Sequence, residues 1–207
     1  MNICIMKRFL ILFLLPFFCV AVYAQQYTLN SPDKKLVVEI ENNQQGISLK
    51  MTKGTDQVLS LSDLGMITSQ TKAESPKVKK TKRNTVNEDI TPVVREKSKT
   101  YRNEYNELIL TFKSDVSLTF RLFNEGMAYR FSMAAQDSLT ITRETLNIQL
   151  HENDSIRFQS EKSFNSAYEQ PYEFKKLGDL NPDRLCNLPL LVEKQNGKFV
   201  MITESDL

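Results

Sequence analysis

The sequence predicts an all-β protein with the fold of an antiparallel β-sandwich, and three observations support this. Apolar and polar residues alternate with a period of two in many segments, such as LVVEIE at 36–41 and NELILTF at 106–112. Turn residues separate these segments at the short spacing of a sandwich. No stretch of ten or more residues has the periodicity of an amphipathic helix. With 207 residues, 41% of them hydrophobic, the chain is long enough to bury one substantial core.

Residues 1–24 have the features of a secretory signal peptide. The basic pair Lys7 and Arg8 precedes the apolar run FLILFLLPFFCVAV, and small residues stand before a predicted cleavage after Ala24. The run is shorter than the roughly 20 residues that span a bilayer and contains Pro16, so we expect cleavage rather than the alternative, a stable membrane anchor. The sequence thus predicts an exported protein, periplasmic or extracellular, whose single domain covers residues 25–207.

Removal of this segment changes the cysteine count and the net charge. Cys4 and Cys19 lie within it, so only Cys186 would remain and no intramolecular disulfide could form. We expect Cys186 to be a buried or half-buried small apolar residue rather than a nucleophile. Lys7 and Arg8 account for two of the 27 Lys and Arg residues, so 25 basic residues balance the 25 acidic ones. The net charge therefore predicts no nucleic acid partner.

The strand predictions follow the alternation along the chain. LVVEIE places Leu36, Val38 and Ile40 on one face. A second series begins at residue 106 and turns at residues 124–126, where Asn, Glu and Gly favour a short loop. It predicts three consecutive antiparallel strands whose inward residues are Leu108, Leu110 and Phe112, then Leu118, Phe120 and Leu122, then Met127, Tyr129, Phe131 and Met133. Shorter alternations at 140–142, 146–150, 156–158 and 199–203 complete the pattern.

A highly charged segment, residues 71–100, interrupts these alternations. Basic residues concentrate between positions 77 and 83, and acidic residues follow at 88 and 89. No aromatic residue lies between the basic ones to stack on bases, so a nucleic acid site is the less favoured interpretation. We expect instead a solvated strand pair and a long loop, in which lysines prevent edge-to-edge pairing of sheets.

The chemistry that the residues can support by themselves is limited. His151 is the one histidine, which excludes mechanisms that need two, and we expect it to be an exposed loop residue. The sequence contains no Gly-rich phosphate loop, no serine nucleophile elbow and no Cys/His metal cluster. Carboxylates and tyrosines remain, and a pair of carboxylates that would hydrolyse a glycoside cannot be located by spacing when the two come from different strands. Acidic residues are numerous in this chain, so their presence alone does not identify such a pair.

Several segments together resemble the N-terminal domain of glycoside hydrolase family 97. In order along the chain they are SPDKKLVVEI, TPVVREKSKTYRNEYNELILTF, RLFNEGMAYRF, AYEQPYE and GKFVMITESDL. The most specific part is YNEL followed by RLFNEGMAYRF. The chain departs from the family pattern at Ile90, where the family usually has a tryptophan, and it contains no tryptophan at all.

The resemblance implies an architecture and an activity. It implies a β-super-sandwich similar to galactose mutarotases, followed in the family by a catalytic (β/α)8 barrel and a small C-terminal β domain. Family members are secreted or periplasmic α-glucosidases and α-galactosidases that act on oligosaccharides, and their catalytic carboxylates lie on the barrel. The resemblance therefore implies no catalytic residue in this chain. We therefore expect this chain to be a sandwich, incomplete at its C-terminus, whose partner in cis is the missing barrel.

The resemblance also implies four site residues. In the family, the glutamate that matches Glu204 reaches from the sandwich to the barrel and helps to bind a Ca²⁺ ion, a hard cation that takes six to eight oxygen ligands. Without the resemblance, a glutamate at a strand end would be an exposed residue with no role. Tyr168, Glu169 and Tyr172 are candidates to face the substrate or the neighbouring domain, although tyrosines near a strand edge more often serve packing.

Two functions from different classes remain open. The first is the non-catalytic sandwich of a secreted, calcium-dependent, exo-acting α-glycosidase. The second is an independent exported module that binds carbohydrate or another partner without hydrolase activity, and the lack of tryptophan argues against it. Mutarotase activity is disfavoured, because that reaction usually needs a histidine among its acid and base groups, and a shared fold does not transfer a function.

Overall fold

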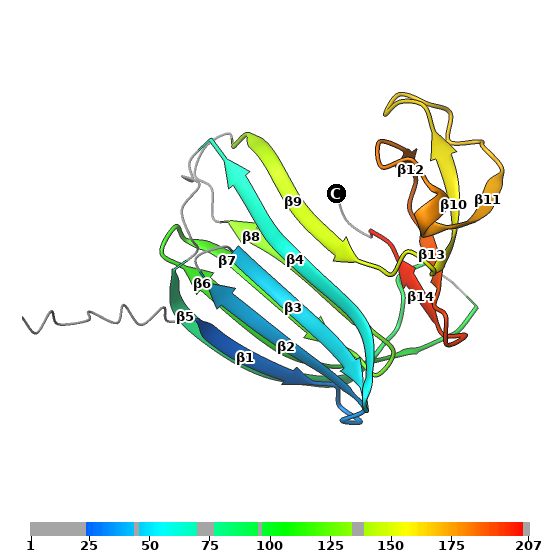
Figure 1. Ribbon diagram of the computed structural model, residues 1–207. Helices are drawn as coiled ribbons and strands as arrows, with labels where there is room; N and C mark the ends of the chain where they lie inside the picture. Colours follow the sequence, from blue (N-terminus) through cyan, green and yellow to red (C-terminus); the bar gives the residue numbers. More distant parts are fainter. Residues whose placement is uncertain (1–23, 44–45, 70–76, 95–96, 134–138, 205–207) are drawn as a thin grey trace, which may run out of the picture.

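The computed structural model describes residues 24–43, 46–69, 77–94, 97–133 and 139–204, which form three antiparallel sheets (Figure 1). The first sheet has the order β1-β2-β3-β4-β9 and the second the order β5-β6-β7-β8. The third has the order β11-β10-β13-β14, with β12 paired to β10. The prediction of an all-β antiparallel sandwich is confirmed.

The strands have the following bounds. In the first sheet they are β1 (Gln25–Asn30), β2 (Leu36–Asn43), β3 (Gly46–Lys53), β4 (Asp56–Thr68) and β9 (Ile141–Gln149). In the second they are β5 (Val78–Ile90), β6 (Tyr101–Phe112), β7 (Val116–Leu122) and β8 (Met127–Met133). In the third they are β10 (Ser155–Glu161), β11 (Tyr172–Lys176), β12 (Leu185–Cys186), β13 (Leu190–Glu193) and β14 (Phe199–Ile202). A 3₁₀ turn, η1 (Leu177–Asp179), follows β11.

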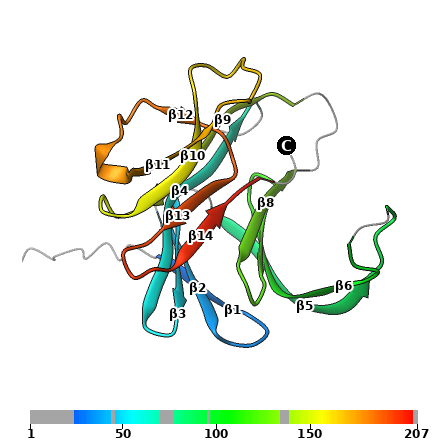
Figure 2. The same ribbon diagram turned by 90° about the vertical axis from the view of Figure 1, so that its right-hand side faces the viewer.

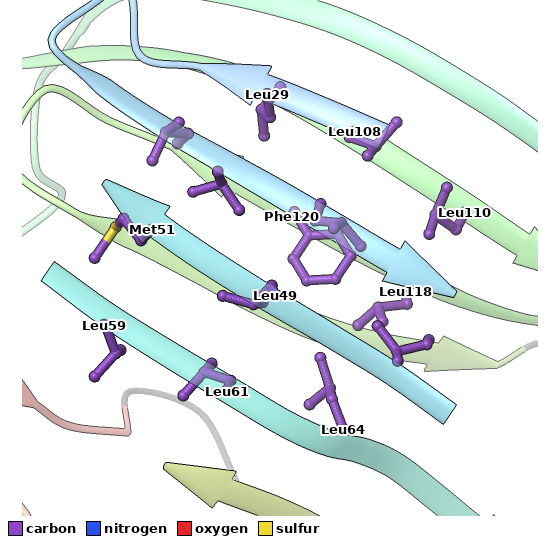
Figure 3. Close-up of a cluster of buried hydrophobic side chains, with 14 of the residues drawn as sticks. Leu29, Leu49, Met51, Leu59, Leu61, Leu64, Leu108, Leu110, Leu118 and Phe120 are labelled. Atoms are coloured by element: carbon purple, nitrogen blue, oxygen red, sulfur yellow. The ribbon is translucent and has the colours of Figure 1, made fainter. Parts of the chain in front are cut away.

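The first and second sheets pack face to face, and the main core lies between them (Figure 3). Because side chains alternate across a strand, every second residue of β2, of β7, of most of β3 and of the second half of β6 points into this core. Val38, Leu108 and Phe120 are completely buried there. Each such side chain contributes about 1.5–3 kcal/mol to folding by leaving water. The inward residues that the sequence predicted for β2, β6 and β7 are confirmed.

The predicted meander of three strands is β6, β7 and β8. Consecutive strands pair antiparallel, and the Phe123 amide donates a 2.8 Å hydrogen bond to the Gly126 carbonyl to close the β7–β8 turn. The inward residues of β8 are half-buried and pack on the main core, as Tyr129 and Phe131 show. The prediction of three consecutive antiparallel strands is therefore confirmed for β6, β7 and β8.

The charged segment forms one strand where the sequence predicted a strand pair. Among the described strands, β5 pairs with β6 alone and lies at the edge of its sheet, and most of its side chains are exposed. The basic residues of positions 77–83 thus lie along a free sheet edge, as expected for residues that oppose edge-to-edge pairing. Residues 71–76 and 95–96 of this segment lie outside the described residues.

The first sheet closes across a large sequence separation. The two predicted alternations at 140–142 and 146–150 belong largely to one strand, β9, which pairs with β4. Ser60 on β4 lies opposite Gln149 on β9. β4 and β9 are therefore neighbours in the first sheet, although all four strands of the second sheet lie between them in the sequence.

The third sheet follows β9 and lies beside the two-layered part (Figure 1). Figure 2 shows its strands β10, β13 and β14 side by side. Ile156, Phe158 and Val192 form a second, smaller core, and Leu150 packs against both cores. The β13–β14 turn is held to the start of β4 by an ion pair between Lys198 and Asp56.

Three further expectations can be compared with the structure. His151 is an exposed loop residue, as predicted. The expectation for Cys186 is wrong, because this residue is exposed at the end of the short strand β12. Partial desolvation nevertheless raises the pKa of its thiol, which agrees with the prediction that it is no activated nucleophile. The signal-peptide prediction concerns residues of which only Ala24 is described, so it stays a prediction. None of the described residues belongs to a helix long and apolar enough to cross a membrane.

Candidate functional site

Glu204 lies two residues beyond β14, an edge strand of the third sheet. It is exposed, and its backbone carbonyl accepts a 3.2 Å hydrogen bond from the Thr203 hydroxyl. The strand predicted at 199–203 is thus confirmed as β14, and it delivers the Glu204 carboxylate to the surface.

The negative charge of Glu204 acts on the phenol of Tyr129. The phenol belongs to β8, is half-buried and packs on the main core. Burial raises its pKa, and the negative charges of Glu144 on β9 and of Glu204 raise it further. The negative charges of Glu144 and Glu204 thus act together on one phenol.

The described residues around Glu204 could supply only part of the ligands of a metal ion. In the described part of the chain, no group of three or more His, Cys, Asp or Glu side chains could hold a metal. Glu204 can offer a hard, exposed carboxylate, the ligand type that Ca²⁺ prefers. A calcium shell of six to eight oxygens would need further ligands from elsewhere.

Tyr168 and Glu169 lie in the loop between β10 and β11. Both are exposed, and Tyr168 has a positive φ of 56°. The Tyr168 hydroxyl donates a 3.0 Å hydrogen bond to the Phe164 carbonyl, and its amide donates a 3.2 Å bond to Ser166 Oγ. These bonds lie within the loop, so the tyrosine shapes the loop rather than filling a core.

Tyr172 begins β11 and lines a groove in the third sheet. The groove has a volume of about 300 Å³, and its lining residues are Arg157, Tyr172, Glu173, Phe174, Pro189, Leu191 and Met201. Within it, the Arg157 guanidinium stacks on the Phe174 ring at 4.3 Å from the centroid and lies 3.4 Å from Glu193. Tyr172 is 59% exposed, and its assignment as a substrate or interdomain residue stays a prediction.

Sequence reasoning missed the rest of this groove. The signal was present, because Tyr172 and Phe174 alternate with charged residues on β11, and Phe199 and Met201 alternate on β14. A run of four or five residues does not show which face is buried, and in these strands the large apolar residues are the exposed ones.

A polar cluster joins the two most specific motifs of the sequence. Tyr105 and Glu107 belong to YNEL, and Arg121 and Phe123 begin RLFNEGMAYRF. The Tyr105 and Phe123 rings lie 5.1 Å apart, and the Arg121 guanidinium lies 4.7 Å from the Tyr105 ring centroid. Burial disfavours the charge of Glu107, but hydrogen bonds from Arg121 and Asn84 outweigh it and lower the pKa of this carboxyl. The cluster ties β5, β6 and β7 together on the face that is turned away from the main core.

Comparisons with known proteins agree on one family. The family profile described as "Glycosyl-hydrolase 97 N-terminal" matches residues 29–207. A retaining alpha-galactosidase of Bacteroides thetaiotaomicron is 32% identical, and the alignment covers 98% of this chain and 32% of that protein. Among solved structures, a glycoside hydrolase family 97 enzyme of Pseudoalteromonas sp. strain K8 is similar in its complexes with panose and with acarbose. Each has a TM-score of 0.69 and 21% identity, over 83% of this chain and 27% of that one. The chain thus spans about a third of the length of its curated relative.

Proposed function

The chain belongs to glycoside hydrolase family 97, and from this membership we propose that it is the non-catalytic N-terminal sandwich of an exported, calcium-dependent, exo-acting α-glycosidase. The observation that carries the proposal is the profile of the family's N-terminal domain, which matches residues 29–207 of a chain that folds as a sandwich. The B. thetaiotaomicron relative, about three times as long as the matched part, is a retaining alpha-galactosidase. In this proposal the remaining two-thirds of such a protein carry the catalytic carboxylates, and the sandwich supports them.

Glu204 is the residue of this chain that we assign to calcium. Its carboxylate is exposed, and Glu144 supplies a second negative charge that also acts on Tyr129, which supports the binding of a cation. Ca²⁺, when bound, would supply positive charge that polarises groups of the sugar beside it. Glu204 itself would hold one coordination position from the sandwich side, and the other ligands would come from the rest of the protein.

The substrate that this proposal implies is an α-linked oligosaccharide. The relative's name points to α-galactosides, and the ligands of the Pseudoalteromonas enzyme are panose and acarbose. The residues that would select between galactose and glucose belong to the part of the relatives that this chain does not match. We therefore propose an α-glycosidase that acts on α-glucosides or α-galactosides.

The experiment that tests the function uses the longer protein that contains this chain. Hydrolysis of nitrophenyl α-glucoside and α-galactoside is measured with calcium and after its removal by a chelator. We expect hydrolysis of one substrate, lost on chelation and restored by added calcium. Activity that does not change on chelation would contradict the calcium-dependent part of the proposal.

The assignment of Glu204 has its own variant and control. Glu204→Gln should weaken calcium binding by about tenfold or more, because a neutral amide replaces a charged ligand. Glu169→Gln removes an equally exposed carboxylate from the β10–β11 loop and should leave calcium affinity unchanged. Calcium titration by calorimetry measures both. If residues 25–207 by themselves bound oligosaccharides, the alternative of an independent binding module would gain instead.

A further inference from the structure

The third sheet buries one face and leaves the other open. Ile156, Phe158 and Val192 point into the second core. On the opposite face, Phe174, Arg157, Leu191 and Met201 are successive cross-strand neighbours on β11, β10, β13 and β14. These four residues form a continuous line across the sheet, which we call the outer row.

The outer row is unusually apolar for a surface. Phe174 is 54% exposed and Met201 is 66% exposed, and both line the 300 Å³ groove together with Leu191. Tyr172 and Pro189 extend the apolar lining at its ends. Contiguous exposed apolar surface of this kind marks a place where another surface packs.

The chemistry of the groove favours protein over sugar. A sugar site combines an open aromatic face with several hydrogen-bonding groups. Here the Arg157 guanidinium covers one face of the Phe174 ring, and the side chains of Pro189, Leu191 and Met201 are apolar. The Tyr172 hydroxyl and the Glu173 carboxylate also line the groove, but Glu173 is already paired with Lys175 and Arg184. Apolar side chains of a protein would fill such a surface, with an oxygen acceptor facing the half-exposed Arg157.

The relatives indicate where such a partner comes from. The matched part of this chain corresponds to the N-terminal third of a longer polypeptide in the B. thetaiotaomicron relative. In such a protein the remaining chain follows the segment that contains β14, the strand that carries Met201. A covalent connection of this kind gives a neighbouring domain a high effective concentration at the outer row.

We propose that the outer row is the docking surface for the catalytic part of the same polypeptide, an inference that rests on the function proposed above. The docked surface presents apolar side chains to Phe174, Leu191 and Met201, and a carboxylate or carbonyl oxygen to Arg157. Tyr172, at the edge of the groove, is then an interdomain residue.

The test measures how accessible the outer row is in the longer protein, prepared from Gln25 onward with Cys186→Ser. A thiol is introduced as Met201→Cys, or as Phe174→Cys in a second variant. The control is Lys50→Cys, an exposed position on the outer face of the first sheet, where Glu39 is its cross-strand neighbour. The rate of maleimide addition to each introduced thiol is followed by mass spectrometry of the peptide that contains it, in native buffer and in denaturant.

We expect the thiols at positions 201 and 174 to react at least about tenfold more slowly than the thiol at position 50 in the native protein, and all three to react alike in denaturant. Equal native rates would overturn the proposal. Protection that disappears on dilution would also overturn it, in favour of a second copy of the chain. Protection that appears only with added oligosaccharide would overturn it in favour of a sugar site.

The labelling does not depend on catalysis, so the two proposals can fail separately. A longer protein without α-glycosidase activity whose outer row is protected would refute the proposed function alone. An active enzyme whose outer row reacts freely would refute the docking surface alone.

Discussion

Arg121 Nε donates a 2.8 Å hydrogen bond to Glu107 Oε2, and this pair links the two sequence motifs that most specifically mark the family. The Glu107 side chain is 8% exposed, whereas that of Arg121 is 48% exposed and covers the Tyr105 ring. The motifs therefore match a structural cluster on the second sheet. The cluster joins β5, β6 and β7 through Asn84, Glu107 and Arg121.

Loss of the guanidinium should destabilise the protein. Arg121→Met leaves the buried Glu107 carboxylate without its charged partner, and we expect a loss of about 1–3 kcal/mol in the free energy of unfolding. Arg102→Met is the control, because it breaks an exposed ion pair with Asp89 and should change stability little. Urea unfolding of both variants, followed by circular dichroism, gives the comparison. Equal losses would contradict the special position of Arg121.

The same cluster should make stability depend on pH. The folded protein holds the pKa of Glu107 below its ordinary value of 4.5, so the ionised carboxyl contributes stability above that pH. The contribution should disappear as the pH falls through the lowered folded-state pKa. The stability difference between the natural protein and Glu107→Gln, taken from unfolding midpoints, should therefore shrink on acidification. A difference that grows in acid would show that the sign is wrong.

The neighbourhood of Tyr129 can be tested by titration. Glu204→Gln removes one of the negative charges that raise the pKa of this phenol, so that pKa should fall. Glu144→Gln should lower it as well, and the double variant should lower it further. NMR of ring-labelled tyrosine follows the titration, and Glu169→Gln serves as the control that should leave Tyr129 unchanged. An unchanged pKa in Glu204→Gln would place this carboxylate away from Tyr129.

The main core should respond strongly to truncation. Phe120→Ala removes a completely buried ring from the centre of β7, and we expect a loss of about 3–5 kcal/mol. Thr119→Ala, on the other face of the same strand, should cost far less. Thermal and urea unfolding distinguish the two. A small effect of Phe120→Ala would mean that the two sheets are not tightly packed there.

The buried carboxylate of Asp154 should stabilise the third sheet. Asp154 is 1% exposed and accepts hydrogen bonds from the amides of His151 at 3.0 Å and Gln195 at 3.3 Å, so it joins the turn after β9 to the β13–β14 turn. Asp154→Ala leaves both amides without this partner, at a cost of about 1–3 kcal/mol. Hydrogen exchange should show faster exchange in β10, β13 and β14 and little change in β6 and β7. Uniform loss of protection would contradict this local role.

The alternation of the sequence predicted the sandwich because long strands with one buried face carry a strong period of two. Leu108, Leu110 and Phe112, for example, point inward as expected. The third sheet was harder to predict, since β12 has two residues and β13 and β14 have four each, too few to define a buried face. The pairing of β4 with β9 has no local signal either, because its partners come from distant parts of the chain.

The candidate site was predicted only in part. The resemblance identified Glu204, Tyr168, Glu169 and Tyr172, but no sequence pattern placed Glu204 near Tyr129 and Glu144. That proximity depends on how the third sheet lies against the other two. The outer row was missed for a similar reason, because its four residues come from four strands and become neighbours only through the register.

The insertion of the second sheet between β4 and β9 has a consequence for the order of folding. The meander of β6, β7 and β8 needs only local turns, whereas Ser60 pairs with Gln149 only after the chain between them has formed the whole of the second sheet or left it as a long loop. Closing so long a loop costs entropy that local hairpins do not have to overcome. During synthesis, the edge of β4 therefore stays unpaired until β9 has been made and can pair with it.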